Sequence, residues 1–349
     1  MTVNDMQQDA SSRAQAIQHS SIFLNALDST RWHMYTPEYL GLVAAGGIDA
    51  VNVTVASETL HEHTLQEAIR AYARWRRRLV LLSPAVRIVH SVRDIEEAKR
   101  NRQLAVILGF QNTLPFEDDL DLVDVFARLG VRIVGLTYNR RNLVGDGCAE
   151  STDSGLSAFG LNLVARLNRL RLVIDLSHAG PRTALHAVEV SESPPVVTHT
   201  NMRAKCDHFR CIQDGVLKAV ADRGGAVGIT ALSIFLREGA LETGSSLDDY
   251  LRHLEYAIEV AGIDHVGIGF DVGYGRSDED TVRLSATYPE FRFPPLHLRY
   301  CEQLNRTDKA QNLVHALIQR GYADADIAKI LGGNFLRVFR LVWGGGQCG

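Results

Sequence analysis

The sequence lacks the features that mark a nucleic-acid or membrane partner. Its 349 residues carry a formal net charge of −4, so there is no basic excess to attract nucleic acid. The most basic stretch, residues 74–78, falls within a predicted helix, and we interpret it as a solvated helical face. No apolar run approaches the ~18 residues that a membrane span needs. We therefore expect neither a nucleic-acid partner nor a membrane partner.

Cysteine is scarce and scattered. The two closest cysteines are five residues apart and form no CxxC pair, which excludes a zinc ribbon; the five are Cys148, Cys206, Cys211, Cys301 and Cys348. We expect reduced, structural thiols in a cytoplasmic protein. The first twenty residues are polar and contain no apolar signal-peptide segment. Residues 1–20 are therefore predicted to be a polar extension of one domain over residues 21–349.

No glycine-rich phosphate loop follows an early strand, which disfavours a doubly wound nucleotide-binding sheet. Instead, short runs rich in β-branched residues alternate with segments of helical periodicity. The runs cover residues 21–27, 50–56, 105–111, 131–138, 172–178, 196–201, 226–232 and 265–271. Helical segments cover residues 120–129, 159–170, 182–190, 214–222 and 247–260. Eight strands alternating with helices predict an α/β fold, a (β/α)₈ TIM barrel closed by C-terminal helices, with a doubly wound open sheet as the alternative.

Polar side chains follow several of the predicted strands, and in a barrel such positions gather at the catalytic face. His178 ends the fifth strand, His199 lies near the end of the sixth, and Asp271 ends the eighth. A single histidine at a strand end is more often a hydrogen-bonded core residue. Two imidazoles on consecutive strands can converge on one divalent ion, and a carboxylate opposite can hold or deprotonate its water. The region after the eighth strand, residues 273–297, is predicted to be a long loop at this face.

Five blocks of sequence resemble successive motifs of the renal (membrane) dipeptidase family. They follow one another in order within a match from about residue 22 to 340, at residues 175–178, 198–201, 206–210, 264–271 and 330–339. The resemblance implies a (β/α)₈ barrel with two bridged zinc ions that cleaves dipeptides and related amides, and it implies a homodimer. The variant segments at residues 109–112 and 136–139 resemble a bacterial branch of the family with altered metal ligands.

The resemblance also implies roles for individual residues. His178 and His199 match the two histidines of the second zinc ion. Asp271 matches the aspartate that transfers a proton, and Arg210 matches the arginine that binds the substrate carboxylate. We add Asn201 as a further candidate for substrate binding.

Three positions depart from the family pattern. The His-x-Asp motif of the first zinc ion is missing from residues 24–29, where Asp28 survives as the aspartate in only one of two registers. Gln111 stands where the family has its bridging glutamate, and a neutral amide cannot bridge two dications. Tyr138 replaces the histidine near the scissile carbonyl. We therefore predict one zinc ion at His178 and His199, with Gln111 as a weak third ligand, and an empty first site.

These residues predict a hydrolase for a dipeptide or small amide with a free carboxylate. Asp271 would act as general base, Arg210 would bind the carboxylate, and Tyr138 would bind substrate and donate a hydrogen bond to the oxyanion. Two alternatives remain on the same barrel: a lyase or isomerase for an amino-acid-derived metabolite, and a metal-free protein that binds carboxylates. His33, His61 or His63 could replace the missing first-metal histidine.

Overall fold

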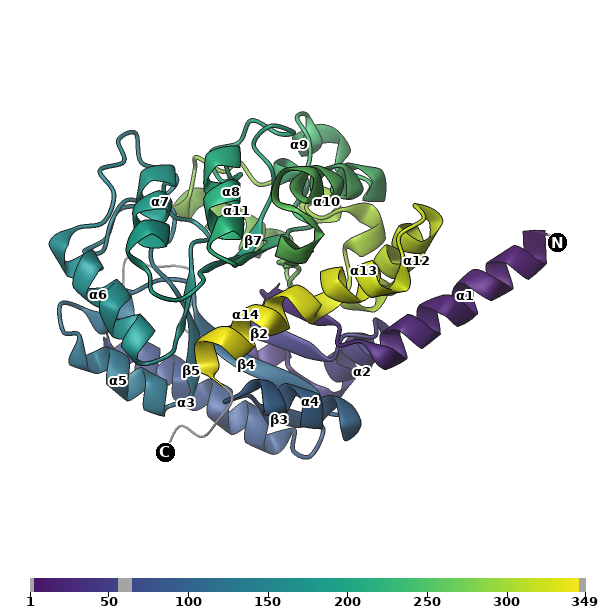
Figure 1. Ribbon diagram of the computed structural model, residues 1–349, viewed down its shortest axis with the longest axis horizontal. Helices are drawn as coiled ribbons and strands as arrows, with labels where there is room; N and C mark the ends of the chain where they lie inside the picture. Colours follow the sequence, from purple (N-terminus) through teal and green to yellow (C-terminus); the bar gives the residue numbers. More distant parts are fainter. Residues whose placement is uncertain (1–2, 56–64, 345–349) are drawn as a thin grey trace.

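The computed structural model describes residues 3–55 and 65–344 (Figure 1), so His61, His63 and Cys348 lie outside the described residues. Within these ranges nine parallel strands form one sheet, and eight of them follow one another in the order β1-β2-β4-β5-β6-β7-β8-β9. The nine strands are β1 (Leu24–Asp28), β2 (Ala50–Thr54), β3 (Val86–Ile88), β4 (Leu104–Phe110), β5 (Val131–Gly135), β6 (Val173–Asp175), β7 (Val196–Thr200), β8 (Ala226–Ile229) and β9 (Val266–Ile268).

The eight-strand path closes into a barrel where its last strand meets its first. Just beyond β9, the backbone N–H of Asp271 donates to the carbonyl of Leu27 at 3.1 Å. The backbone N–H of Phe270 donates to the side-chain oxygen of Asn25 at 2.9 Å. Most strand residues are buried, as expected for parallel strands covered on both faces. The predicted (β/α)₈ barrel is confirmed, and each of the eight predicted runs contains or overlaps its strand.

Helices surround the barrel (Figure 1), and the five predicted helical segments correspond to α5, α6, α7, α8 and α10. The helices are α1 (Val3–Ser20), α2 (Pro37–Ala45), α3 (Leu65–Leu81), α4 (Val92–Arg100), α5 (Asp121–Arg128), α6 (Ala158–Arg169), α7 (Pro181–Val190), α8 (Asp214–Asp222), α9 (Ala240–Thr243), α10 (Leu247–Ala261), α11 (Asp278–Thr287), α12 (Gln311–Gln319), α13 (Asp324–Ala328) and α14 (Asn334–Trp343). No helix in the described part of the chain is long and apolar enough to cross a membrane.

The last helix closes the barrel at the end where the strands begin. Phe335 and Phe339 of α14 belong to one buried apolar cluster with Leu24, Ala50 and Ala105, which lie at or near the starts of their strands. In Figure 1, α14 crosses in front of β2, β4 and β5. The opposite end, where the strands finish, is left for the loops that carry polar side chains.

The polar segment at the start of the chain is a helix attached to the C-terminal helices. Ala14 and Ile17 of α1 are buried. The Arg13 guanidinium donates to the Asp324 carboxylate at 2.7 Å and to the Tyr322 carbonyl at 2.8 Å. The C-terminal half of α1 therefore packs on the body of the protein, whereas its N-terminal half extends away from it (Figure 1).

Two elements differ from the prediction. Residues 273–297 are not a loop throughout, because they contain α11. Ser277 and Asp280 form a capping box at its start: the Ser277 hydroxyl accepts from the Asp280 N–H at 3.2 Å, and the Asp280 carboxylate accepts from the Ser277 N–H at 3.1 Å. The high content of proline and charge in this region concealed that signal. Strand β3, which pairs with the start of β4, was missed because its short run contains Arg87 and is only partly buried, so it does not resemble a buried apolar strand.

Candidate active site

Two buried histidines meet at the carboxyl ends of β6 and β7. His178 follows β6 with a positive φ of 66°, and His199 lies within β7. Their Nε2 atoms are 2.9 Å apart. Burial, together with the charge of Arg210, lowers the pKa of both imidazoles well below the usual value. Both rings are therefore neutral at neutral pH, the state in which imidazole binds a metal.

The orientation of His199 is set by a hydrogen-bonded chain beneath it. The Thr198 hydroxyl donates to the Asp175 carboxylate at 2.6 Å, so its oxygen accepts from Nδ1–H of His199 at 2.8 Å. The Asp175 carboxylate also accepts from the Ser177 N–H and hydroxyl and from the Thr198 N–H. With its hydrogen on Nδ1, His199 presents an unprotonated Nε2 to His178.

His178 has two possible protonation patterns, and its neighbours show why. Its Nδ1 lies 2.6 Å from the Asn139 side-chain oxygen and 3.1 Å from Nε of Arg210. A guanidinium can only donate, so a bond from Arg210 requires a bare Nδ1 and a hydrogen on Nε2, shared with His199. A bond from Nδ1–H to Asn139 instead leaves two bare Nε2 atoms facing each other, and that arrangement needs a cation between them.

The amide of Gln111 supplies a third donor atom. Its Oε1 is 3.2 Å from Nε2 of His178, and its Nε2 donates to the Thr54 hydroxyl at 2.6 Å, which fixes the direction of the amide. These three neutral donors fit a single ion. They do not fit a bridged pair, because no carboxylate stands among them. Among residues 11–55 and 65–344, no three His, Cys, Asp or Glu side chains gather as a metal site.

Asp271 follows β9 with a positive φ of 56°, and its backbone carbonyl accepts from the Ser29 hydroxyl at 3.0 Å. Burial raises the pKa of Asp271 to about 6, against the opposing charges of Arg210, Arg276 and Arg299. A carboxyl with this pKa is largely ionised at pH 7 and can still accept a proton in that range, which suits a general base.

Arg210 and Tyr138 pack directly against the histidines. Nη2 of Arg210 donates to the His199 carbonyl at 2.8 Å, and its guanidinium lies 6.0 Å from the Phe235 ring centre. The Tyr138 ring stacks on His178 with 4.1 Å between ring centres. These contacts hold both side chains at the edge of the same pocket.

One pocket of about 590 Å³, open to solvent, collects these groups. Its lining is partly polar and partly aromatic, and consists of Ser29, Gln111, Tyr138, Asn139, His178, Arg210, Leu232, Phe235, Asp271, Arg276, Leu284, Tyr288, Phe291, Phe293, Arg299 and Tyr300. The structure therefore brings together six of the predicted site residues on one surface: Gln111, Tyr138, His178, Arg210 and Asp271 line the pocket, and His199 contacts His178 behind it.

Two predicted site residues lie away from this lining. The Asp28 carboxylate accepts hydrogen bonds from the hydroxyls of Tyr35 and Tyr39 and from the Thr30 N–H. Asn201 is completely buried and donates to the Thr230 carbonyl at 3.2 Å. Both are held by interactions within the protein. His33 lies in a short 3₁₀ turn and borders a separate pocket with Trp75.

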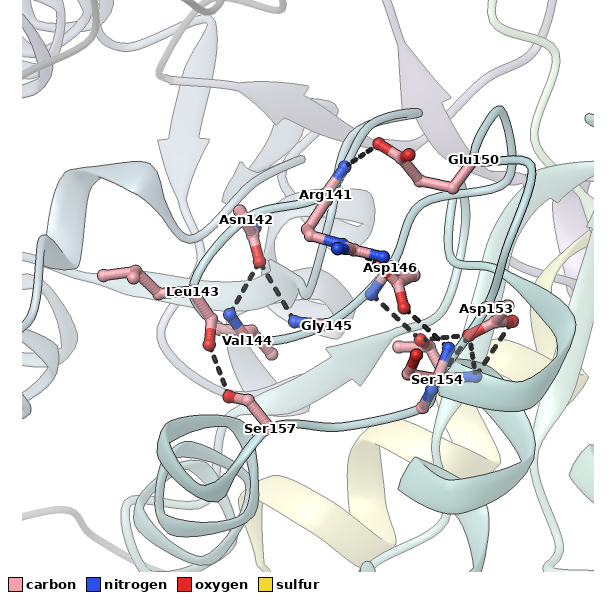
Figure 2. Close-up of polar contacts among 12 residues, drawn as sticks. Arg141, Asn142, Leu143, Val144, Gly145, Asp146, Glu150, Asp153, Ser154 and Ser157 are labelled. Atoms are coloured by element: carbon pink, nitrogen blue, oxygen red, sulfur yellow. Dashed lines mark hydrogen bonds and ion pairs between the residues drawn. The ribbon is translucent and has the colours of Figure 1, made fainter.

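The loop between β5 and α6 follows a strand end of the barrel and is held by a network of hydrogen bonds (Figure 2). The Asp146 carboxylate pairs with Arg141 and accepts from the Ser154 N–H at 2.7 Å. The Glu150 carboxylate accepts from the Arg141 N–H at 2.7 Å. Asp146 and Glu150 therefore order the loop.

Comparison with known proteins agrees with this architecture. The model of the membrane dipeptidase family (peptidase family M19) matches residues 30–288 and 298–343. The chain belongs to the membrane dipeptidase family. An amidohydrolase structure from Pseudomonas aeruginosa is 31% identical and superimposes with a TM-score of 0.85, covering 95% of this chain and 99% of that one. A second structure from that organism, of the probable dipeptidase PvdM, shares the fold at 21% identity and a TM-score of 0.82, covering 96% of this chain and 99% of that one.

Two sequence relatives of this member of the membrane dipeptidase family are 29% and 26% identical to it. An uncharacterised Klebsiella pneumoniae protein from the pqqA 5′ region is 29% identical over 74% of this chain and 89% of its own length. Dipeptidase tcpJ of Claviceps purpurea is 26% identical over 82% of this chain, and the match spans 62% of that protein.

Several functional neighbours were not predicted from the sequence. Asn139, Thr198 and Asp175 contact the histidines or support them, and Arg276 and Arg299 bring charge to the pocket. Thr198 and Asp175 stand inside the motifs that carry the family resemblance, so their position was a usable signal. Arg299 lies outside every motif, and no sequence signal marked it.

Proposed function

We propose that this protein hydrolyses a dipeptide or a similar small amide that carries a free carboxylate. The observation that carries the proposal is the shared pocket of Asp271 and Arg210, with the neutral His178–His199 pair at its base. One pocket thus offers a carboxylate with a pKa of about 6 and a guanidinium that can bind a substrate anion. General-base hydrolysis of an anionic amide can use the first group to accept a proton and the second to orient the substrate.

We further propose that the histidine pair holds one zinc ion, with Gln111 as a weak third ligand, and that the family's first site is empty. Zinc at such a position would polarise the substrate carbonyl and acidify a bound water. Three neutral donors beside the Arg210 cation should bind it more weakly than a set that contains a carboxylate. We do not include Asp28 among the ligands, since its carboxylate accepts hydrogen bonds from two tyrosines and a backbone N–H.

Three residues of the chain then have separate roles in the proposed reaction. Asp271, ionised at neutral pH, accepts a proton from the attacking water and returns it to the leaving amine. Arg210 binds the substrate carboxylate and orients the scissile bond. The Tyr138 hydroxyl donates to the oxygen on which negative charge develops.

The test combines metal content with a dipeptide panel. We expect one zinc per chain by mass spectrometry of the dialysed protein and amine release from dipeptides but not from their carboxyl-terminal amides. His199→Ala should abolish both the bound zinc and the activity, whereas His315→Ala on α12 serves as a matched control. If the zinc-loaded protein cleaves no dipeptide, the proposed hydrolase activity is rejected. If two zinc ions bind per chain, the proposed single zinc site is rejected.

One alternative has an observation in its favour. In the pattern with a hydrogen between the two Nε2 atoms, the chain from Arg210 through His178 and His199 to Thr198 is satisfied without a metal. This favours the metal-free carboxylate-binding protein over a lyase or isomerase. Carboxylate binding that persists after chelation, without amine release, would support it. A cytoplasmic location and a homodimer stay predictions of the sequence.

A further inference from the structure

Arg299 is a buried cation with few partners. Only 4% of the residue is exposed. Its Nη1 donates to the Thr281 hydroxyl at 3.2 Å, while its Nε is buried without a hydrogen-bond partner. Among the described residues, no carboxylate lies within 4.0 Å of its guanidinium. Burying a charge without a counter-ion is costly, so an arginine in this state calls for an explanation.

The backbone holds Arg299 firmly in place. The Ser233 N–H donates to the Arg299 carbonyl at 2.9 Å, and the next residue, Tyr300, bridges to Leu232 beyond β8. The guanidinium lies 4.7 Å from the Phe293 ring centre, and such stacking keeps a guanidinium in one orientation. Arg299 is therefore positioned before any ligand arrives.

Arg299 and Arg210 line the same pocket and are linked by aromatic contacts. The Arg210 guanidinium lies over Phe235, Phe235 contacts Phe291 with 6.2 Å between ring centres, and Phe291 stacks on Phe293 at 5.4 Å. Phe293 in turn supports Arg299. An apolar wall thus connects two guanidinium groups in one pocket, and a ligand lying along it meets a cation at each end of this series of contacts.

The pocket lining holds more guanidinium groups than carboxylates. Three guanidinium groups line it, those of Arg210, Arg276 and Arg299, and Asp271 is the single carboxylate among the residues that form the lining. The two histidines are neutral. The charge of Arg299 helps to lower the pKa of Asp271, but the two side chains form no salt bridge. A substrate with one carboxylate would satisfy Arg210 and leave Arg299 without an ion pair.

We propose that Arg299 binds a second carboxylate of the substrate, so that the preferred substrate is a dipeptide-like amide with an acidic side chain. This inference rests on the proposed hydrolase function and specifies its substrate class. The carboxylate would receive charge-assisted hydrogen bonds from a guanidinium whose desolvation has already occurred on folding.

The experiment uses pairs of dipeptides that differ only in side-chain charge. We expect the full-length, zinc-loaded protein to prefer alanyl-glutamate over alanyl-glutamine, or glutamyl-alanine over glutaminyl-alanine, by about 10-fold to 100-fold in kcat/KM, the range expected for a charge-assisted hydrogen bond. Arg299→Gln should bring that ratio close to one, and Arg299→Lys should restore part of it. Arg283→Gln, at an exposed arginine of α11, is the control and should keep the ratio.

A binding measurement separates this inference from the proposed function. Glutarate should bind the unmodified protein at least about tenfold more tightly than its monomethyl ester by calorimetry, and Arg299→Gln should remove the difference. If no dipeptide is cleaved but the tight binding of glutarate depends on Arg299, the proposed hydrolase activity is rejected and the anion site at Arg299 is supported. If amide and acid are cleaved equally and glutarate binds no better than its ester, Arg299 has only a packing role and the inference is overturned. A lower Tm of Arg299→Gln with an unchanged ratio would overturn it as well.

Discussion

The β6–β7 side of the barrel mouth and the β1 side each bury an aspartate at a strand end, Asp175 and Asp28. Asp175 is surrounded by short donors from Ser177 and Thr198, and the Thr198 hydroxyl also contacts His199. Asp28 is surrounded by the phenols of Tyr35 and Tyr39, and its bonds lead into the packing of α2 and away from the pocket. Both carboxylates are more than nine-tenths buried.

The difference shows that a strand-end aspartate gains a role through its neighbours. A hydroxyl on the adjacent strand can link the carboxylate to an imidazole. Its hydrogen is donated to the carboxylate, and its oxygen accepts the N–H of the ring. Two large phenols instead saturate the carboxylate and fill the space around it. On the β1 side the aspartate binds side chains of the surrounding fold, and on the β6–β7 side it orients the His199 ring through Thr198.

The largest expected effect concerns Asp271. This residue follows β9, which lies between the β6–β7 side and the β1 side of the barrel. Asp271→Asn should lower kcat/KM by about 100-fold or more, because an amide cannot accept the proton of the attacking water. Its zinc content should stay unchanged, since among the described residues Asp271 forms no metal-binding group with the histidine pair. Measured turnover within about threefold of the unmodified protein would remove Asp271 from the catalytic role.

Asp28→Asn tests the β1 side. We expect a loss of about 2 kcal/mol in the free energy of unfolding, because two buried tyrosine hydroxyls lose a charged acceptor. Denaturant unfolding measures this loss, and Tyr35→Phe should produce an effect in the same direction. The bound zinc should be the same as in the unmodified protein. Loss of zinc from Asp28→Asn would show that Asp28 is a metal ligand and would contradict the difference between the two sides.

Thr198→Val interrupts the link on the β6–β7 side at nearly constant volume. His199 loses the acceptor that holds the hydrogen on Nδ1, so zinc affinity should fall about tenfold, within the range seen for second ligand shells. Competition with a chelator measures the affinity. Thr113→Val removes another buried hydroxyl outside the pocket and controls for the cost of the substitution itself. Equal affinities in the two variants would contradict the role of this link.

The smallest effect is in the pH profile. A base must be ionised to work, so kcat/KM should rise through the Asp271 pKa of about 6 and be roughly halved at pH 6 relative to its plateau. Burial also raises the pKa of the Asp28 carboxyl, but Asp28→Asn should leave the midpoint of the activity profile in place. A midpoint that moves in Asp28→Asn would show that the two sides interact electrostatically.

The fold could be predicted because its signals are local. Each buried strand is a short β-branched run, and each helix has its own periodicity, so eight runs implied the barrel. The same logic placed His178, His199 and Asp271 at one face, since all parallel strands finish at the same end. The capping box of α11 was equally local and was overlooked.

The partners of those residues could not be predicted, because they depend on how the chain turns back and on which elements pack together. Tyr35 and Tyr39 meet Asp28 only when α2 and the turn before it fold back on β1, and Asn139 reaches His178 from a different strand end. Arg299 reaches the pocket only because its segment pairs with residues beyond β8. The sequence by itself determined the barrel and the strand-end residues, because periodicity is written along the chain. Which side chains contact, and therefore which charges stay unpaired in the pocket, was decided by tertiary packing, because hydrogen bonds and burial depend on distances that sequence separation does not encode.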